Sequence, residues 1–356
     1  MKNTMLIIDG SALLTASYYG NLPSQVKACK DLEEEKQYYQ FIRQTPDGTY
    51  TNALFGFLNR LDDLVDVYQP DHIAITFDES RNSTFRAKMY PQYKGTRRET
   101  PEPLKEQKPL MMQILKEIGI PVLSHPLYEG DDIIGSLCKT FASDDMKCVV
   151  YANDRDMTQL VGKNTRMWYT CQSVERAKSM YEQFCADNNL PNPKPYEDLP
   201  IPAGCFVFNP TTVAWKFGIL PSQVPDWKGL GGDNSDNIPG VRGISEETAG
   251  KILQHFNSIE DLFTTIEQTS EDEMEAMWTE YGLKKASLTA LKKPEAKESA
   301  ILSKKLATIL VDLPIFLPLE YFNASVIDYV KEDELRTKYC IEREDEQAES
   351  FLDRED

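Results

Sequence analysis

The amino-acid sequence predicts an α/β fold built on an open parallel sheet. Short apolar segments rich in β-branched residues alternate with longer helical patterns in the first half of the chain, which is typical of a βαβ arrangement. The segments that we expect to form buried strands are Met5–Asp9, His72–Asp78, Ile120–Leu123 and Lys147–Asp154. Three of these segments end in an aspartate. Because such sheets bind ligands at the carboxyl ends of their strands, the aspartates predict a functional site there.

Two helical patterns lie between these strands, at Ala53–Tyr68 and Leu104–Ile118. The second pattern follows Pro101 and Pro103, and proline suits the first turn of a helix. Both patterns are therefore expected to cover the sheet.

Composition distinguishes four further segments. Residues 21–51 read as an insertion with a hairpin at Pro46-Asp47-Gly48. Residues 188–210 are rich in proline and asparagine and predict a linker-like insertion. Residues 211–320 predict a smaller helical domain. Residues 321–356 predict an acidic C-terminal tail, because eleven acidic and five basic residues follow from Lys331 onward and favour partial disorder.

The composition also excludes several classes of protein. The seven cysteines are scattered without a CxxC pair, which argues against a zinc site and a disulfide framework. The three histidines lie far apart, so histidine acid–base chemistry is not expected. No apolar run approaches the ~20 residues of a membrane span, and the N-terminal residues do not read as a secretory signal. We expect a cytoplasmic protein with no membrane partner and no small-molecule cofactor.

The net charge of −18 disfavours a polyanionic partner, but the charge is unevenly distributed. Residues 81–108 carry a local charge of +5, against −23 for the remainder. The basic residues are Arg81, Arg86, Lys88, Lys94, Arg97, Arg98, Lys105 and Lys108. This segment indicates a local phosphate-binding track, and the alternative is a solvated charged face.

Five short acidic motifs follow one another along the chain. They are Asp9-Gly10-Ser11, Phe77-Asp78, Tyr128–Asp132, Asn153–Asp156 and Gly232–Asn237. Each motif alone is weak evidence, because an aspartate after a strand is commonly a helix N-cap. Together the motifs contribute nine carboxylates: Asp9, Asp78, Glu129, Asp131, Asp132, Asp154, Asp156, Asp233 and Asp236.

Nine carboxylates gathered at one place would repel one another strongly unless cations bind between them. Carboxylate oxygens suit Mg²⁺, and Mn²⁺ can substitute for it. Two such ions ~4 Å apart can activate a water, bind a phosphate and stabilise the leaving oxygen. No nucleophilic side chain is then required. The motifs therefore predict a site with two magnesium ions that hydrolyses phosphodiesters.

The denser parts of these motifs resemble the 5′-nuclease superfamily. The segments that carry the resemblance are Phe85–Glu102, Gly119–Gly135, Gly232–Leu253 and Ser303–Pro314. They are similar to the 5′→3′ exonuclease domain of bacterial DNA polymerase I and to free-standing phage flap endonucleases. The resemblance implies a PIN-like, resolvase-like core at residues 1–187 with a helical arch or clamp at about 79–110. It also implies that residues 211–320 form a helix-three-turn-helix DNA-binding domain.

The resemblance further implies how the carboxylates are shared between two metal ions. Asp9, Asp78, Glu129 and Asp131 would hold the first ion, with Asp132 close by. Asp154, Asp156, Asp233 and Asp236 would hold the second ion, with Asp131 facing both.

The resemblance also implies the residues that contact DNA. Arg86, Lys94 and Arg97 match positions that grip the substrate phosphate, where cations stabilise the charge of the transition state. Tyr93 matches a residue that stacks on an unpaired base. Lys228 matches a basic position ahead of the fifth acidic motif.

A turn at Gly240–Ile244 is expected to approach duplex phosphate, with a monovalent cation such as K⁺ between them. Gly240 and Gly243 permit a close approach of the backbone, and the helix that follows offers its N-terminus to the anion. Ser245 stands where the family usually has glycine, and it can cap that helix. Glu247 stands where a basic residue is common and should weaken the attraction.

The sequence thus predicts a structure-dependent 5′-nuclease that gives 5′-phosphate and 3′-hydroxyl ends in DNA replication or repair. The expected partners are DNA with free 5′ ends (flaps, nicks and branched duplexes) and RNA–DNA hybrids, and the expected state is a monomer in a bacterial or phage-infected cell. One alternative, a PIN-type ribonuclease, explains the first four motifs but not the later segments. Another, a non-catalytic protein that binds branched DNA, would be expected to lack metal-binding acids.

Overall fold

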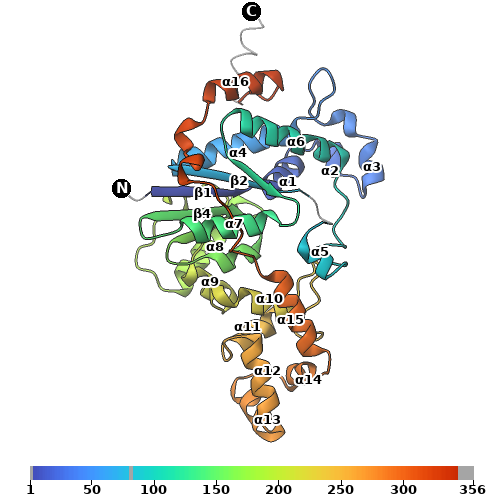
Figure 1. Cartoon of the computed structure of the whole chain (residues 1–356), viewed down its shortest axis with the longest axis vertical. Helices are drawn as coiled ribbons and strands as arrows, with labels where there is room; N and C mark the ends of the chain where they lie inside the picture. Colours follow the sequence, from blue (N-terminus) through green and yellow to red (C-terminus); the bar gives the residue numbers. More distant parts are fainter. Residues whose placement is uncertain (1–2, 80–82, 344–356) are drawn as a thin grey trace, which may run out of the picture.

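The computed structural model describes residues 3–79 and 83–343, and its centre is a six-stranded sheet (Figure 1). The strand order is β3-β2-β1-β4-β5-β6. Neighbouring strands are parallel, except that β6 is antiparallel to β5. The bounds are β1 (Asn3–Asp9), β2 (His72–Asp78), β3 (Val122–His125), β4 (Met146–Ala152), β5 (Thr165–Thr170) and β6 (Cys205–Phe208).

Helices cover both faces of the sheet, because alternate side chains of each buried strand point to opposite sides. Leu6 and Ile8 of β1 belong to one apolar cluster, and Met5 and Ile7 belong to another. The first cluster is completed mainly by α1 (Gly10–Gly20), α4 (Asn52–Tyr68) and α6 (Glu102–Glu117). The second is completed mainly by α7 (Gly130–Phe141), α8 (Val174–Asp187) and α9 (Pro210–Phe217).

A second, all-helical unit lies below the sheet in Figure 1 and has its own apolar core around Trp227, Ile252 and Trp278. Its helices are α10 (Val224–Gly231), α11 (Glu246–Leu253), α12 (Ile259–Gln268), α13 (Glu271–Glu280), α14 (Lys285–Leu291) and α15 (Ala296–Ala307). After α15 the chain returns to the sheet domain and packs on α7. A Cβ at Gly135 would lie 2.7 Å from Ile309, so this return segment leaves room only for glycine.

The predicted fold class is confirmed, with two differences in the sheet. The predicted strands at Met5, His72 and Lys147 are present as β1, β2 and β4, whereas the third begins two residues late, after Pro121. Strands β5 and β6 were not predicted. The linker-like interpretation of residues 188–210 is wrong for Cys205–Phe208, which forms β6, because this short apolar run is embedded in a proline-rich segment.

The insertion at residues 21–51 packs beside α1 and α4. It contains α2 (Ser24–Lys27), α3 (Leu32–Lys36) and the 3-10 helix η1 (Tyr39–Phe41). The predicted hairpin is present, since Gln44 pairs with Tyr50 in an antiparallel bridge around the turn at Pro46-Asp47-Gly48. The insertion therefore covers part of the apolar cluster to which α1 and α4 belong.

The prediction of a partly disordered acidic tail is wrong for residues 321–343, the part of it that the structure describes. This part forms η5 (Leu319–Phe322), η6 (Ala324–Val326) and α16 (Tyr329–Lys338). Leu335 and Ile341 are buried in the first apolar cluster. Arg336 is 1% exposed and binds Glu332 and Asp62 at 2.7 and 2.8 Å, so opposite charges hold this acidic segment to α4. Residues 344–356 lie outside the described residues.

None of the helices in the described residues combines the length and the apolar character that a membrane crossing requires.

The docking of α16 leads to a stability prediction. Leu335 is 3% exposed, so Leu335→Ala should leave a cavity and lower the free energy of unfolding by about 2–5 kcal/mol. Val330 lies on the same helix and is 73% exposed, so Val330→Ala should change it by less than about 0.5 kcal/mol. Urea denaturation of both variants measures the difference. Equal effects would show that α16 is not part of the core.

Candidate active site

A cavity of about 650 Å³ opens at the carboxyl ends of β1, β2 and β4. Six carboxylates line it: Asp9, Asp78, Glu79, Glu129, Asp131 and Asp154. All except Glu79 were predicted from the sequence, and they reach the cavity from strand ends and helix starts. The same cavity is lined by cations, among them Lys94, Arg97 and Lys108.

Two of these aspartates lie where a strand ends. Asp9 is the last residue of β1, and its Oδ1 accepts a hydrogen bond of 2.9 Å from the amide of Ala12 in the first turn of α1. Asp78 is the last residue of β2, and its Oδ1 accepts one of 2.7 Å from the amide of Gly130. Among the described residues, each aspartate therefore keeps at least one oxygen that accepts no backbone hydrogen bond.

Three more acids are fixed by helix starts. Glu129 is the N-cap of α7, and Asp131 lies in its first turn. Asp154 follows β4 and caps the 3-10 helix η2 (Arg155–Leu160), accepting a hydrogen bond of 2.9 Å from the amide of Asp156. Anions at helix N-termini are stabilised by the unpaired amides there, which partly offsets the repulsion among the acids.

The remaining repulsion changes the protonation of the cluster. Burial, and then the charge of Asp78, raises the pKa of Asp9 to about 7. Burial, and then the charge of Asp9, raises the pKa of Asp131 well above its usual range. The ionised carboxylates are thus costly in the metal-free protein, and a cation bound among them would lower that cost.

Lys94 lies among these acids rather than on the surface. Its side chain is 7% exposed, and its Nζ lies 2.8 Å from Glu129 and 3.8 Å from Asp236. Burial opposes its charge, but Glu129 and Asp236 raise the pKa of Lys94 above its usual range. Arg97, 35% exposed, also pairs with Asp236. Both predicted phosphate-binding residues are therefore bound to protein carboxylates here.

The expected base-stacking role of Tyr93 does not agree with the structure. Tyr93 is 7% exposed, and its hydroxyl donates to Glu129 at 3.1 Å and Asp236 at 3.2 Å. Its ring packs with Ile238 and Leu306. The turn that carries Tyr93 and Lys94 closes onto the loop of the fifth acidic motif, because the Lys94 amide also donates to the Asp236 carbonyl at 2.8 Å.

Lys228 is likewise not a surface contact for DNA. It is 1% exposed on α10, where its Nζ lies 3.0 Å from Asp156 and also binds Asp233. Although burial acts in the opposite direction, Lys228 lowers the pKa of Asp233 to about 2. Burial, and then Asp154, raises the pKa of Asp156 to about 7. Lys228 therefore neutralises two acids that the sequence assigned to a metal ion.

Arg86 and Asp132 are bound to each other inside the protein, away from the positions expected for a phosphate contact and a metal ligand. Arg86 is 2% exposed, and Asp132 is fully buried. Their fork is bidentate, with both distances 2.7 Å, and Arg86 also binds Glu129 and the carbonyls of Leu306 and Thr308. Asp132 also accepts from the amides of Glu129 and Leu310. Neither side chain has a group left to bind a metal ion or a substrate.

The predicted turn at residues 240–243 lies at the start of α11. Gly240 and Gly243 have φ of +61° and +99°, and a Cβ at Gly240 would lie 2.3 Å from the amide nitrogen of Gly232, so only glycine fits there. Ser245 caps α11 by accepting from the amide of Thr248, as predicted. The amide and carbonyl of Gly240 bind Ser303 and Ser299 of α15, so they are engaged within the protein.

The rest of the basic segment is mostly paired with acids. Arg98 binds the buried Glu35 of the insertion at 2.9 Å, and Lys105 binds Glu99 and Glu102. Lys108 donates to the carbonyl of Asp78 at the edge of the cavity. Arg81 lies outside the described residues. Part of the basic segment therefore neutralises acids of the protein itself.

The cluster fits divalent cations by its donor chemistry. In the part of the chain that the structure describes, no three His, Cys, Asp or Glu side chains already form a group that could hold a metal ion. Four of the nine acids, Glu129, Asp156, Asp233 and Asp236, are instead bound to lysine or arginine. The donors are nevertheless all carboxylates, which magnesium prefers. Oδ1 of Asp156 is buried, and Nζ of Lys228 lies 3.0 Å from it, so this oxygen would serve as a ligand only once Lys228 moves away.

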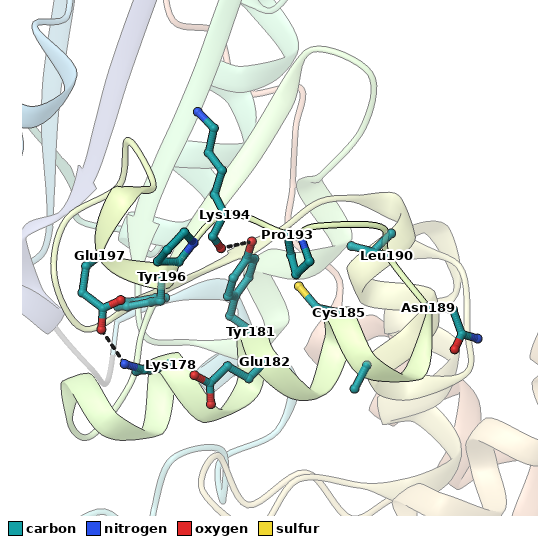
Figure 2. A pocket seen from close by; sticks show the side chains of 12 residues that line it. Lys178, Tyr181, Glu182, Cys185, Asn189, Leu190, Pro193, Lys194, Tyr196 and Glu197 are labelled. Atoms are coloured by element: carbon teal, nitrogen blue, oxygen red, sulfur yellow. Dashed lines mark hydrogen bonds and ion pairs between the residues drawn. The ribbon is translucent and has the colours of Figure 1, made fainter.

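A second cavity, of about 530 Å³, lies between α8 and residues 189–197 (Figure 2). Tyr181 donates to the carbonyl of Lys194, and Lys178 binds Glu197 at 2.6 Å. This cavity shares no lining residue with the first and contains no carboxylate cluster. It is therefore not a second candidate for the chemistry.

Comparison with known families agrees with this geometry. Residues 4–187 match the model of the 5′-3′ exonuclease N-terminal resolvase-like domain, and residues 219–329 match that of the 5′-3′ exonuclease C-terminal SAM fold. The chain belongs to the 5′-3′ exonuclease family, which confirms the predicted resemblance and its class of nuclease enzymes.

Among curated proteins, DNA polymerase I of Lactococcus lactis subsp. cremoris is 34% identical over 321 residues, 90% of this chain and 30% of that protein. DNA polymerase I of Bacillus subtilis is 33% identical over 314 residues, 88% of this chain and 28% of that protein. The chain thus spans about 30% of the length of these relatives.

Solved structures share the fold at low identity. T5 5′-exonuclease with bound zinc has a TM-score of 0.54 and 16% identity, covering 94% of this chain and 99% of that one. The catalytic core of Rad2 in complex with DNA substrate has a TM-score of 0.51 and 12% identity, covering 98% and 91%. These two likenesses support the fold.

The raised pKa values predict an unusual pH dependence of stability. Folding disfavours the ionised forms of Asp9 and Asp156, whose pKa values of about 7 lie above the ~3.9 of an unfolded aspartate. The folded state therefore binds more protons between these values, and stability falls as the pH rises through this window. In EDTA, the melting temperature should be higher at about pH 5.5 than at about pH 7.5.

Magnesium should reduce this loss, because it stabilises the ionised acids. Asp9→Asn should also reduce it in EDTA, since one titrating group is removed. Thermal unfolding with and without Mg²⁺ makes the comparison. A melting temperature in EDTA that stays constant or increases toward pH 7.5 would contradict the assignment.

The Arg86 fork predicts a large effect on stability. Arg86→Met keeps much of the volume but leaves Asp132 buried without its cation, which should cost about 3–5 kcal/mol of unfolding free energy. Arg97→Met at the partly exposed pair should cost less than about 1 kcal/mol. Urea denaturation measures both. If Arg86→Met does not fold, Arg86→Lys keeps the charge but cannot form the fork, and an unchanged free energy of unfolding for that variant would contradict the importance of the fork.

Proposed function

We propose that this chain is a structure-dependent 5′-nuclease that removes 5′ flaps and digests DNA from 5′ ends with two Mg²⁺ ions. The observation that carries the proposal is the cavity at the ends of β1, β2 and β4, where Asp9, Asp78, Asp131 and Asp154 converge beside Lys94. Acids and a lysine in one cavity are what hydrolysis of a phosphodiester by metal ions requires. The products would be a 5′-phosphate and a 3′-hydroxyl.

The carboxylates that face the cavity would hold the ions. Within residues 3–79 and 83–343, Asp9, Asp78, Asp131 and Asp154 each have an oxygen that makes no backbone hydrogen bond, whereas Glu129, Asp156, Asp233 and Asp236 are bound to lysine or arginine. The second group would become available once these cations move. When bound, the metal ions activate water and stabilise the charge of the leaving oxygen.

Lys94 and Arg97 would contribute by turning from Glu129 and Asp236 to the phosphate of the substrate. Lys94 has φ of +55°, an unusual backbone conformation for lysine that holds its side chain in the cavity. A cation placed there stabilises the phosphate most as negative charge develops in the transition state. Lys94 is therefore expected to affect the chemical step more than binding.

The proposed substrates are duplexes with a free or branched 5′ end, including RNA–DNA hybrids. The turn at Gly240–Gly243 and the N-terminus of α11 would approach the duplex, with a K⁺ ion between backbone and phosphate. Ser245 is free to remain a helix cap in this arrangement. We propose that the protein acts as a monomer.

Two other functions are less well supported. A PIN-type ribonuclease would not need the helical unit that begins at α10, and that unit matches a family model of its own. A non-catalytic protein that binds branched DNA would not need to retain a cluster of carboxylates in one cavity. The nuclease accounts for both features.

The test compares end-labelled flap, nicked and single-stranded DNA and the corresponding RNA, in Mg²⁺ and in EDTA. We expect cutting of 5′ flaps that requires Mg²⁺. Asp131→Asn should reduce the single-turnover rate by at least about 10³-fold, because a shared metal ligand is lost. Binding of the flap in Ca²⁺ should be unchanged or tighter. Magnesium-dependent cutting by Asp131→Asn at the normal rate would refute the proposed site, and cutting of RNA alone would favour the ribonuclease.

A further inference from the structure

One ion pair joins the acidic turn after β4 to the helical unit. Arg155 lies between Asp154 and Asp156 at the start of η2, and Glu246 is the first residue of α11. The guanidinium of Arg155 donates to both carboxylate oxygens of Glu246, at 3.1 and 3.0 Å. The two side chains are 39% and 37% exposed, so the pair is partly shielded from solvent.

The pair is held in place by a buried tryptophan of α10. The Cζ of Arg155 lies 5.6 Å from the centroid of the Trp227 ring. The indole Nε1 of Trp227 donates to the backbone carbonyl of Glu246 at 2.8 Å. The end of α10 also packs closely on Glu246, since a Cβ at Gly231 would lie 3.0 Å from the Cα of Glu246. Contacts with α10 at both Arg155 and Glu246 therefore hold this ion pair in place.

The position of this ion pair is informative because Arg155 and Glu246 each neighbour a different part of the proposed site. Arg155 shares its turn with two acids of the site, and Glu246 directly follows Ser245, the cap of the helix proposed to approach the duplex. Arginine in a bidentate fork fixes orientation as well as distance. The pair thus connects the acids of the site with the start of that helix.

We propose that Arg155 and Glu246 are a positioning pair that fixes the distance between the duplex-binding turn and the Asp154–Asp156 acids, and so determines where the substrate is cut. The inference rests on the proposed nuclease function. Neither side chain needs to touch DNA. A small misplacement of the substrate relative to catalytic groups can lower a rate strongly, so even a partly exposed pair can affect the cleavage position.

The experiment uses the full chain and a 5′-flap substrate labelled at the 5′ end, with single-turnover rates and product lengths as readouts. Arg155→Ala and Glu246→Ala should each lower the rate by about three- to tenfold and spread the cuts over neighbouring positions. The double variant should be no worse than either single variant, because both remove the same interaction. The charge swap, Arg155→Glu with Glu246→Arg, should restore the ion pair in part, so that a larger fraction of the product has the wild-type length than in either single variant.

Glu247→Ala is the matched control. Glu247 is also in the first turn of α11, but it binds only Lys251 of the same helix among the ion pairs in the described residues. Its loss changes the local charge as Glu246→Ala does and should tighten binding of the duplex, yet it should not spread the cuts. Arg155→Lys separates charge from geometry, because lysine keeps the charge but cannot form the fork.

Hydrogen exchange gives a readout that does not depend on nuclease activity. Glu246→Ala should speed exchange of the amides of η2, which lie in another segment of the chain, whereas Glu247→Ala should not. If wild type cuts no DNA, the proposed function fails while the exchange experiment still tests the pair.

The positioning role is refuted if Glu246→Ala cuts at the wild-type position and rate while Arg155→Ala is impaired, since Arg155 would then act directly on DNA. It is also refuted if the effects of the two single variants add in the double variant, or if exchange in η2 is unchanged by Glu246→Ala.

Discussion

The structure depends on the neutralisation of acids that the strand ends and helix starts bring together. Three buried cations do most of this: Arg86 binds Glu129 and Asp132, Lys94 binds Glu129 and Asp236, and Lys228 binds Asp156 and Asp233. The side chains of these cations are at most 7% exposed. Removing one partner of a buried pair leaves a charge in a medium of low polarity, at a cost of several kcal/mol. The acids of the site are therefore stable in the fold only when these three cations pack beside them.

The contacts of these buried cations also join the two domains. Lys228 comes from α10 of the helical unit, and Arg86 binds the carbonyls of Leu306 and Thr308, where the chain leaves α15 and returns to the sheet. The turn that carries Lys94 is held to the loop of the fifth acidic motif through the carbonyl of Asp236. The site is thus built at the junction of both domains, and charge pairing across it helps to position one domain on the other.

The sequence predicted the central strands and the acids but not how the charges pair. Continuous apolar runs identify β1, β2 and β4, whereas β5 places the exposed Arg166 within an apolar run and β6 is a run of four residues beside prolines. Arg86 and Lys228 read as phosphate contacts, because a sequence does not distinguish a buried cation from an exposed one. Arg86 lies 46 residues from Asp132 and Lys228 lies 72 residues from Asp156, so only the folded chain brings these two pairs together. Leu335 was missed because the charges around it dominate the composition of its segment.

The same pairing implies that metal ions and substrate strengthen each other's binding if the proposed function holds. If Lys94 turned to a phosphate alone, Glu129 and Asp236 would lose a cation in a buried place, at a cost of several kcal/mol. If a divalent cation bound alone, Lys94 would remain close to it, and the two positive charges would repel each other. A cation among the acids together with a phosphate beside Lys94 satisfies every charge. The resting pairs would then weaken the binding of a metal ion or a phosphate alone, and each would bind more tightly in the presence of the other, which favours cutting of correctly bound DNA.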